Sequence, residues 1–287
     1  MTDWALRYTS HLGYRPPEMQ LQFPATVGTT DLTDHIDFVA QVGFAGVLYP
    51  WATSRAHDEV VEVAAALRSR NLACSTLVGI PPDLNERNLW SDRSPHARAL
   101  LSGELLKTIR MAQLLGAEVL ALLIGKDPQR ADDDQRDDIA ANVRDLAHLA
   151  SDHGMTVAME PMTMLSNAYL TTMADGIRFI DAVDHPAAKL IYDTGHVAMA
   201  GEDLMGAFLA AYDRIALIQL ADLPGRVEPG AGELAIVPVA AEALRRGYGG
   251  LVDLEHGWRD EGRDGERIGL DRIKAFDAAV RGAAADV

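Results

Sequence analysis

The sequence has a single cysteine and too few basic residues to balance its acids. Cys74 lies in an apolar run and, as the one cysteine among 287 residues, can form no internal disulfide. This usage is typical of a reducing compartment, so we expect a cytoplasmic protein. Lys and Arg number 26 against 42 Asp and Glu, which gives a formal net charge of −16. That charge disfavours a nucleic-acid backbone or an anionic membrane as the main partner.

Long apolar runs are also lacking. No uncharged apolar segment reaches the roughly 18 residues that a membrane-spanning helix needs, so we expect no membrane span. The opening M-T-D-W-A-L-R-Y has no basic segment followed by an apolar one, and we therefore expect no signal peptide. Hydrophobic residues nevertheless make up 48% of the chain, which allows a large core. Because no linker or low-complexity tract divides the sequence, we expect one domain over residues 1–287.

Short apolar segments alternate with segments of helical period along the whole chain. The predicted strands are Ala5–Ser10, Ala45–Tyr49, Ala73–Val78, Val119–Ile124, Thr156–Glu160, Lys189–Asp193, Ala216–Gln219 and Leu251–Glu255. The predicted helices are Asp31–Val42, His57–Ser69, Pro95–Leu115, Asp134–His153, Met173–Val183, Asp203–Tyr212, Pro238–Arg246 and Glu266 to about Arg281. Eight parallel βαβ units predict a (β/α)₈ TIM barrel, with a doubly wound parallel sheet as the alternative.

The last four predicted strands each end in one oxygen-bearing side chain. These residues are Glu160, Asp193, Gln219 and Glu255. In a barrel the carboxyl ends of the strands surround one mouth, so we expect the four side chains to converge. Three crowded carboxylates repel one another unless protons or a cation compensate. Carboxylate and amide oxygens suit a hard divalent ion, so the sequence predicts one metal site for Mn²⁺ or Mg²⁺.

A polar loop follows the seventh predicted strand. It lies within I-Q-L-A-D-L-P-G-R-V-E-P-G-A-G-E, from Ile218 to Glu233, and contains two prolines and three glycines. Such a run after a buried strand is where an α/β protein places its chemistry. We interpret Asp222 and Glu228 as residues that orient or cap this loop. Glu233 can cap the loop or face the substrate, and it remains a candidate for substrate binding.

Four motifs resemble the hydroxypyruvate isomerase family. They are E-P after the fifth strand, D-T-G-H after the sixth, Q-x-A-D-x-P-G-R-x-E-P-G-x-G-E after the seventh and L-E-H after the eighth. The likeness covers roughly Leu114 to Trp258. That family belongs to the xylose-isomerase-like superfamily of sugar isomerases and epimerases. The resemblance implies that Glu160, Asp193, Gln219 and Glu255 bind one divalent metal. It also implies that Glu160 and Glu255 form the acid/base pair, and that His196 and Arg226 hold substrate oxygens.

The chemistry of these residue types agrees with the resemblance. An isomerase or epimerase of this kind removes a proton beside a carbonyl, and the resulting enediolate needs a nearby positive charge. Two carboxylates on opposite sides of a substrate can take and return that proton. Arg226 offers a planar fork for a substrate carboxylate or hydroxyl pair. We therefore predict a metal-dependent isomerase or epimerase of a small sugar, keto-sugar or hydroxy-keto acid.

The sequence departs from the family in the parts expected to form the substrate pocket. The second strand continues G-V-L-Y-P-W from Gly46 to Trp51, where the family usually has G-V-E-x. Tyr49 and Trp51 predict a more apolar or bulkier substrate, and His11 at the end of the first strand is a further candidate to line the mouth.

Other functions stay open at this point. A metal-dependent lyase, either a dehydratase or a C-glycoside-cleaving enzyme, would use the same carboxylate pair. A non-catalytic sugar-binding barrel would keep the fold alone. A related endonuclease would need more histidine ligands and a basic groove, which the net charge of −16 disfavours. The expected partner is a small carbohydrate-like molecule, and the sequence permits a homo-oligomer.

Overall fold

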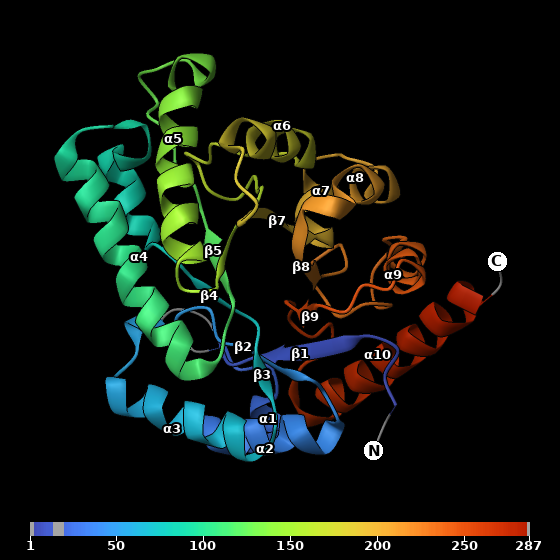
Figure 1. The fold of residues 1–287 in the computed structure, drawn as a ribbon. Coiled ribbons are helices and arrows are strands. Elements are labelled where there is room, and N and C mark those ends of the chain that lie inside the picture. The colour runs from blue at the N-terminus through green and yellow to red at the C-terminus, as the bar shows by residue number, and fades with distance from the viewer. Residues whose placement is uncertain (1–2, 14–19, 286–287) are drawn as a thin grey trace.

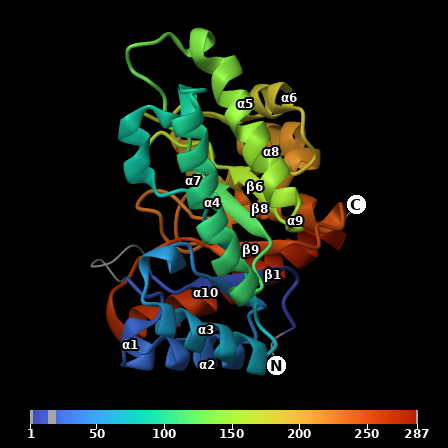
Figure 2. The ribbon, with the colours of Figure 1, turned by 60° about the vertical axis from the view of Figure 1, so that its left-hand side comes forward.

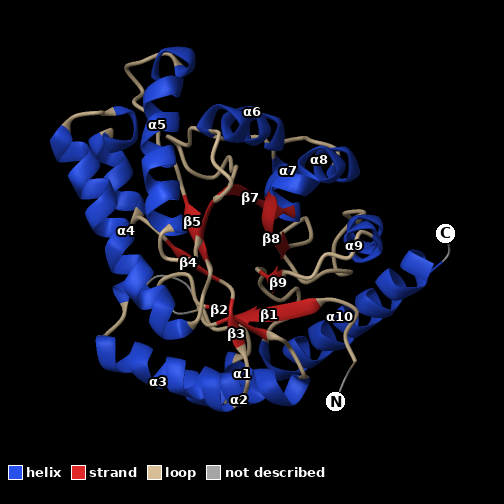
Figure 3. Ribbon diagram, viewed as in Figure 1, coloured by secondary structure: helices blue, strands red, loops and turns tan. Residues whose placement is uncertain are grey.

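Parallel strands form a ring at the centre of the molecule, and helices surround that ring (Figures 1 and 3). The computed structural model describes residues 3–13 and 20–285. Its strands are β1 (Arg7–His11), β2 (Gly46–Leu48), β3 (Ala73–Cys74), β4 (Thr76–Val78), β5 (Val119–Leu122), β6 (Thr156–Met159), β7 (Ala188–Asp193), β8 (Ile215–Leu220) and β9 (Leu251–Leu254). They pair in the order β3-β2-β1-β9-β8-β7-β6-β5-β4.

The ring closes through the third predicted strand, which the structure divides in two. Only Ser75 separates β3 from β4. β3 pairs with β2 and β4 pairs with β5, both in parallel. Because β3 and β4 lie at opposite ends of the strand order, they are consecutive parts of one barrel strand. The predicted (β/α)₈ barrel is confirmed, and the doubly wound sheet is excluded because its two edges would not meet.

Helices cover the outside of the barrel. They are α1 (Pro24–Val27), α2 (Leu32–Val42), α3 (His57–Ser69), α4 (Pro95–Leu115), α5 (Asp132–Ser151), α6 (Met173–Val183), α7 (Thr194–Met199), α8 (Leu204–Ala211), α9 (Ile236–Arg245) and α10 (Gly262–Ala285). Two views place α1, α2 and α3 on one side of the barrel and α5 and α6 on the opposite side (Figures 1 and 2). In the described part of the chain, no helix combines the length and the apolar character needed to cross a membrane.

Capping residues explain why the helix bounds could be predicted closely. The helices α3, α4 and α6 have the predicted bounds. At α4, the Ser94 side chain accepts a hydrogen bond from the backbone N–H of Ala97, and Gly116 ends the helix in the left-handed conformation. In contrast, α5 begins two residues earlier than predicted, at Asp132, because three acidic residues in its first turn suit the helix dipole.

The interior of the barrel is built in layers. Ala121, Ala158, Ile191 and Leu217 form a small apolar cluster separate from the main core. Side chains two residues apart in a strand share a face. The next layer on β6, β7 and β8 is therefore formed by Glu160, Asp193 and Gln219, one step closer to the carboxyl ends of the strands. The apolar layer thus forms the floor beneath the predicted metal site.

Candidate active site

The four predicted metal ligands lie at four neighbouring strand ends. Glu160 directly follows β6, Asp193 is the last residue of β7, Gln219 lies in β8 and Glu255 directly follows β9. Asp193 and Gln219 are partners in the β7–β8 register. Asp193 and Gln219 are buried, while the side chains of Glu160 and Glu255 are 10% and 20% exposed. The site is therefore shielded on its walls and open at the mouth.

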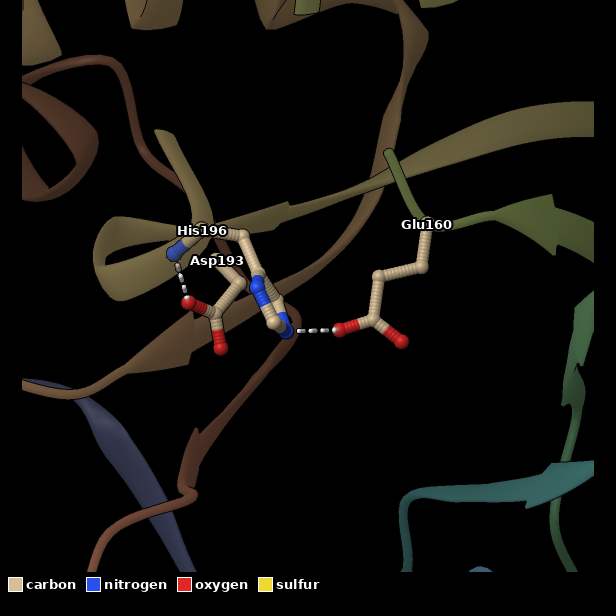
Figure 4. A group of neighbouring side chains, drawn as sticks. All are labelled: Glu160, Asp193 and His196. Atoms are coloured by element: carbon tan, nitrogen blue, oxygen red, sulfur yellow. Dashed lines mark hydrogen bonds and ion pairs between the residues drawn. The ribbon is translucent and has the colours of Figure 1, made fainter. Parts of the chain in front are cut away.

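Glu160, Asp193 and His196 form the tightest group of candidate ligands (Figure 4). One ligand atom from each of the three lies within 4.8 Å of the other two. His196 Nε2 lies 3.5 Å from Glu160 Oε1, and the backbone N–H of His196 donates to Asp193 Oδ1 at 2.7 Å. Asp193 thereby caps α7 and sets the direction of His196. The structure therefore groups His196, which the resemblance assigned to the substrate, with two of the predicted metal ligands.

Arg226 places its guanidinium between two of the carboxylates. Its Nη2 donates to Asp193 Oδ2 at 2.9 Å, and its Nη1 donates to Asp193 Oδ1 at 3.3 Å. The same Nη2 lies 3.7 Å from Glu255 Oε2. This two-pronged contact is the one that a planar guanidinium forms and an ammonium cannot. Arg226 is thus a fixed positive charge at the mouth, 21% exposed at the side chain.

The loop between β8 and α9 is organised around one buried carboxylate. Asp222 accepts hydrogen bonds from the backbone N–H groups of Gly230, Gly232 and Leu234. A Cβ at Gly232 would lie 2.4 Å from Asp222 Oδ1, so the close approach requires glycine there. The prediction that Asp222 orients the loop is confirmed. The loop can therefore hold Arg226 with a positive φ of 50°, which few residues other than glycine adopt.

A second buried carboxylate ties this loop to α10. Glu228 is fully buried, accepts from Arg272 Nη1 at 2.6 Å and accepts from the backbone N–H of Arg259 at 2.9 Å. Its predicted role as a loop brace is confirmed. Together with Asp222 it makes the position of Arg226 a property of the fold, fixed before any substrate arrives.

Crowding shifts the protonation of the site. Burial raises the pKa of Glu160 well above its ordinary value, and the charges of Glu255 and Asp193 raise it further. Burial raises the pKa of Glu255 to about 8, although the Arg226 guanidinium opposes the shift. Burial lowers the pKa of His196, so its ring is neutral at neutral pH. A divalent cation beside these groups would favour the ionised carboxylates.

Buried polar atoms without partners offer a test of whether a metal fits. Gln219 Oε1, Glu255 Oε2 and His196 Nδ1 are buried and have no hydrogen-bond partner among the described residues. Buried polar atoms are normally satisfied, so such atoms call for a ligand. Oxygens of this kind, from strand ends next to those of Glu160 and Asp193, are the donors that a hard divalent cation prefers, and Glu160, Asp193 and His196 already place ligand atoms within 4.8 Å of one another. The residues present therefore fit one metal ion.

The other predicted substrate residues lie apart from this group. Tyr49 is fully buried and its hydroxyl donates to Glu59 Oε1 of α3 at 2.7 Å. Trp51 is half-buried just after β2, and Glu233 is exposed on the β8–α9 loop. His11 is buried, and its Nε2 shares a 3.2 Å hydrogen bond with the carbonyl oxygen of His256. His11 lines a cavity of about 420 Å³ between the loops that follow β1 and β9.

One buried acid of the site was missed by the sequence analysis. Asp253 of β9 is fully buried, and burial raises its pKa to about 6 while hydrogen bonds from neighbours such as Thr9 oppose the shift. The sequence D-L-E from Asp253 to Glu255 could have indicated this residue, because side chains two residues apart share one face of a strand. Asp253 lies one step below the strand end, beneath Glu255.

Comparisons with known proteins identify the family. The sequence profile described as "Xylose isomerase-like TIM barrel" matches residues 36–276. Hydroxypyruvate isomerase of Escherichia coli is 25% identical over 235 residues, covering 80% of this chain and 89% of the relative. D-psicose 3-epimerase of Ruminiclostridium cellulolyticum is 27% identical over 127 residues, covering 44% of this chain and 43% of the relative.

Solved structures agree on the fold. The 3-keto-D-glucoside 4-epimerase of E. coli matches with a TM-score of 0.73 at 18% identity, covering 95% of this chain and 99% of that one. A family 2 AP endonuclease from Brucella melitensis matches with a TM-score of 0.74 at 19% identity, covering 91% and 96%.

Fold and site together define a TIM barrel with a carboxylate-rich mouth. The chain belongs to the xylose isomerase-like TIM barrel family, and the resemblance found in the sequence motifs is confirmed. The relatives that cover most of the chain include proteins named hydroxypyruvate isomerase and one named 2-oxo-tetronate isomerase, while the sequence matches to epimerases are shorter. The structural match to an endonuclease, at 19% identity, concerns the fold alone.

Proposed function

We propose that this protein is a metal-dependent isomerase or epimerase of a small sugar, keto-sugar or hydroxy-keto acid. One observation carries the proposal: acidic residues, an unpartnered amide oxygen and a fixed arginine meet at the carboxyl ends of four neighbouring strands. The names of the relatives supply the substrate class, since they include hydroxypyruvate, 2-oxo-tetronate, D-psicose and L-ribulose. All of these names denote small oxygen-rich molecules.

Glu160, Asp193, Gln219 and Glu255 are the residues that would hold the metal. A divalent cation supplies positive charge for the oxygens of an enediolate when it is bound. Mn²⁺ and Mg²⁺ are the ions that suit an all-oxygen donor set. His196 lies within reach of the same point, and its Nδ1 has no partner among the described residues. We assign His196 to the substrate, because the four strand-end residues already offer four oxygen-bearing side chains to the cation.

Glu160 and Glu255 are the proposed acid/base pair. They follow β6 and β9, which are separated in the ring by β7 and β8, so they approach a bound substrate from different directions. One carboxylate removes the proton from the carbon beside the carbonyl, and the other returns a proton to the neighbouring carbon or to the opposite face. A base works best when its pKa is near the working pH. The raised pKa of Glu255, about 8 before any cation binds, supports an acid role, because its surroundings favour the protonated form.

His196 and Arg226 are proposed to position the substrate. The neutral imidazole of His196 can donate to a substrate oxygen from the Asp193 side of the mouth. Arg226 is held by the braced loop. Its Nη1 and Nη2 contact Asp193, and the guanidinium N–H groups that remain can donate to a substrate oxygen. Water is kept from the floor of the site by the apolar layer of Ala158, Ile191 and Leu217.

A panel of substrates in deuterated water tests this proposal. The metal-free protein is supplied with Mn²⁺ or Mg²⁺ and then with hydroxypyruvate, 2-oxo-tetronates and ketoses, and the products are followed by NMR. We expect turnover of at least one compound, deuterium at the carbon beside the carbonyl, and loss of both with a chelator. Turnover without any label would indicate a hydride shift. Loss of water or of an aglycone would indicate a lyase, and binding without turnover a non-catalytic barrel.

The pKa of Glu255 predicts how pH changes the effect of metal on stability. A carboxyl with a folded-state pKa of about 8, against an ordinary value of 4.5, favours the folded state at low pH. That contribution is lost as the pH rises through 8. A cation must displace the same proton, so its stabilising effect grows over this window. The measurement is thermal unfolding with and without Mg²⁺ between pH 6 and pH 8.5. We expect Mg²⁺ to raise the Tm more at pH 8.5 than at pH 6. A smaller rise in Tm at the higher pH would contradict this.

Removal of the Arg226 guanidinium should weaken substrate binding. Hydrogen bonds to charged groups contribute about 1.5–3 kcal/mol, so Arg226→Ala should raise KM about 10- to 100-fold. We expect the metal content to stay unchanged, because Asp193 remains in place. Arg226→Lys is the matched control, since it keeps the charge and loses the fork. Loss of metal in Arg226→Ala, or an unchanged KM, would show that Arg226 only braces Asp193 and the loop.

A further inference from the structure

Asp253 is a buried acid for which the proposed reaction has no use. It is fully buried on β9, and no lysine or arginine whose side chain the structure describes forms an ion pair with it. Burying a carboxylate without a cationic partner costs free energy. A residue retained at that cost in the layer below Glu255 therefore points to a specific task in the site.

The strand register places Asp253 beside a proposed metal ligand. Thr9 of β1 and Gln219 of β8 are both register partners of Asp253, and Asp193 is the next partner beyond Gln219. These four side chains thus form one row across four adjacent strands. Within the row, Thr9 Oγ1 donates to Asp253 Oδ1, and Gln219 Nε2 donates to Asp253 Oδ2 at 3.4 Å.

Hydrogen bonding to Asp253 decides which end of the Gln219 amide faces the mouth. An ionised carboxylate accepts hydrogen bonds and cannot donate them, so it selects the amide nitrogen. The amide oxygen must then point the other way, and Gln219 Oε1 is indeed buried with no partner among the described residues. Without Asp253, the amide NH₂ would be drawn toward the carboxylates of the mouth and would present hydrogens where a cation needs an oxygen.

We propose that Asp253 is a positioning residue that keeps the oxygen of the Gln219 amide directed at the metal site. The inference rests on the proposed function, because it gives Gln219 Oε1 a cation to bind. Thr9 completes the arrangement: its hydroxyl occupies the second oxygen of Asp253 and so fixes the plane of the carboxylate. Outer partners of this kind orient metal ligands in many proteins.

A double-mutant cycle on metal affinity tests the proposal. The metal-free protein is titrated with Mn²⁺, and free Mn²⁺ is followed by electron paramagnetic resonance. Asp253→Ala removes the acceptor, and we expect its affinity to fall about 10- to 100-fold, as for the loss of other outer partners. Asp253→Asn removes the charge but can still accept from Gln219 while donating to Thr9, so its affinity should stay close to that of the wild type. In a Gln219→Ala background, Asp253→Ala should cause no further loss.

The outcomes separate this inference from the function on which it rests. Wild-type affinity in folded Asp253→Ala, or an equal loss in both backgrounds, would overturn the positioning role and leave the metal site intact. A loss in Asp253→Asn as large as in Asp253→Ala would also overturn it, since charge alone would then explain the effect. Absence of Mn²⁺ binding in the wild type would contradict the proposed function itself. If Asp253→Ala does not fold, Thr9→Val takes its place, with a smaller loss expected only when Gln219 is present.

Discussion

Glu255→Gln should lose about 10²- to 10⁴-fold in kcat, the range that one general acid or base contributes. The amide cannot exchange a proton with the substrate at neutral pH, yet it keeps an oxygen for the metal. We therefore expect Mn²⁺ to remain bound while turnover falls. The effect should appear in kcat and in kcat/KM together, because the lost interaction acts in the transition state.

A matched variant separates this effect from a general change of charge. Glu62→Gln makes the same replacement at an exposed position of α3 and should retain full activity. Retained turnover in Glu255→Gln would assign the acid/base role to another residue. Loss of metal together with activity would show that Glu255 acts chiefly as a ligand.

Asp193→Asn should bind the divalent metal at least 10- to 100-fold more weakly. Loss of a residue that only hydrogen-bonds to a metal ligand typically costs 10- to 100-fold in affinity, and loss of a charged ligand should cost no less. The variant removes a charge and keeps an oxygen that can cap α7. Asp193→Ala removes the cap as well, at a cost of about 0.5–2 kcal/mol in stability. We therefore expect metal loss in both variants, at least as large in Asp193→Ala, and a lower Tm in Asp193→Ala alone. Metal analysis that matches the wild type in either variant would contradict the assignment.

Much of the fold follows from local patterns in the sequence. Apolar strands and capped helices alternate regularly, and the bounds of α3, α4 and α6 depend on residues within a few positions. The ends of β6 and β9 fall one residue before Glu160 and Glu255, because strand ends are set by pairing with neighbours. The division of the third strand at Ser75 has the same origin, since β3 and β4 pair with different strands.

The sequence predicted which residues lie at the candidate site where their position depends on strand order. It did not predict contacts that depend on packing between distant segments. Once the barrel is assumed, Glu160, Asp193, Gln219 and Glu255 must lie at neighbouring strand ends. The direction in which a side chain points does not follow from strand order. The Tyr49 hydroxyl donates a hydrogen bond to Glu59 of α3, and no sequence pattern near Tyr49 predicts this contact.

Contacts between residues far apart in the sequence also explain why the motifs did not predict the arrangement of the site. Arg226 contacts Asp193 across 33 positions of the sequence. Asp253 meets Thr9 across 244 positions. Each contact depends on the closure of the barrel and on the braced loop after β8, so the sequence alone indicated the residues and not their arrangement.

The position of the metal is the most direct test of this account. Crystals soaked in Mn²⁺ would locate the ion by its anomalous scattering. We expect one peak at about 2–2.6 Å from an oxygen of each of Glu160, Asp193, Gln219 and Glu255, distances typical of hard cations. A peak bonded to a nitrogen of His196, with Gln219 and Glu255 out of reach, would contradict it, as would the absence of any peak at the mouth of the barrel.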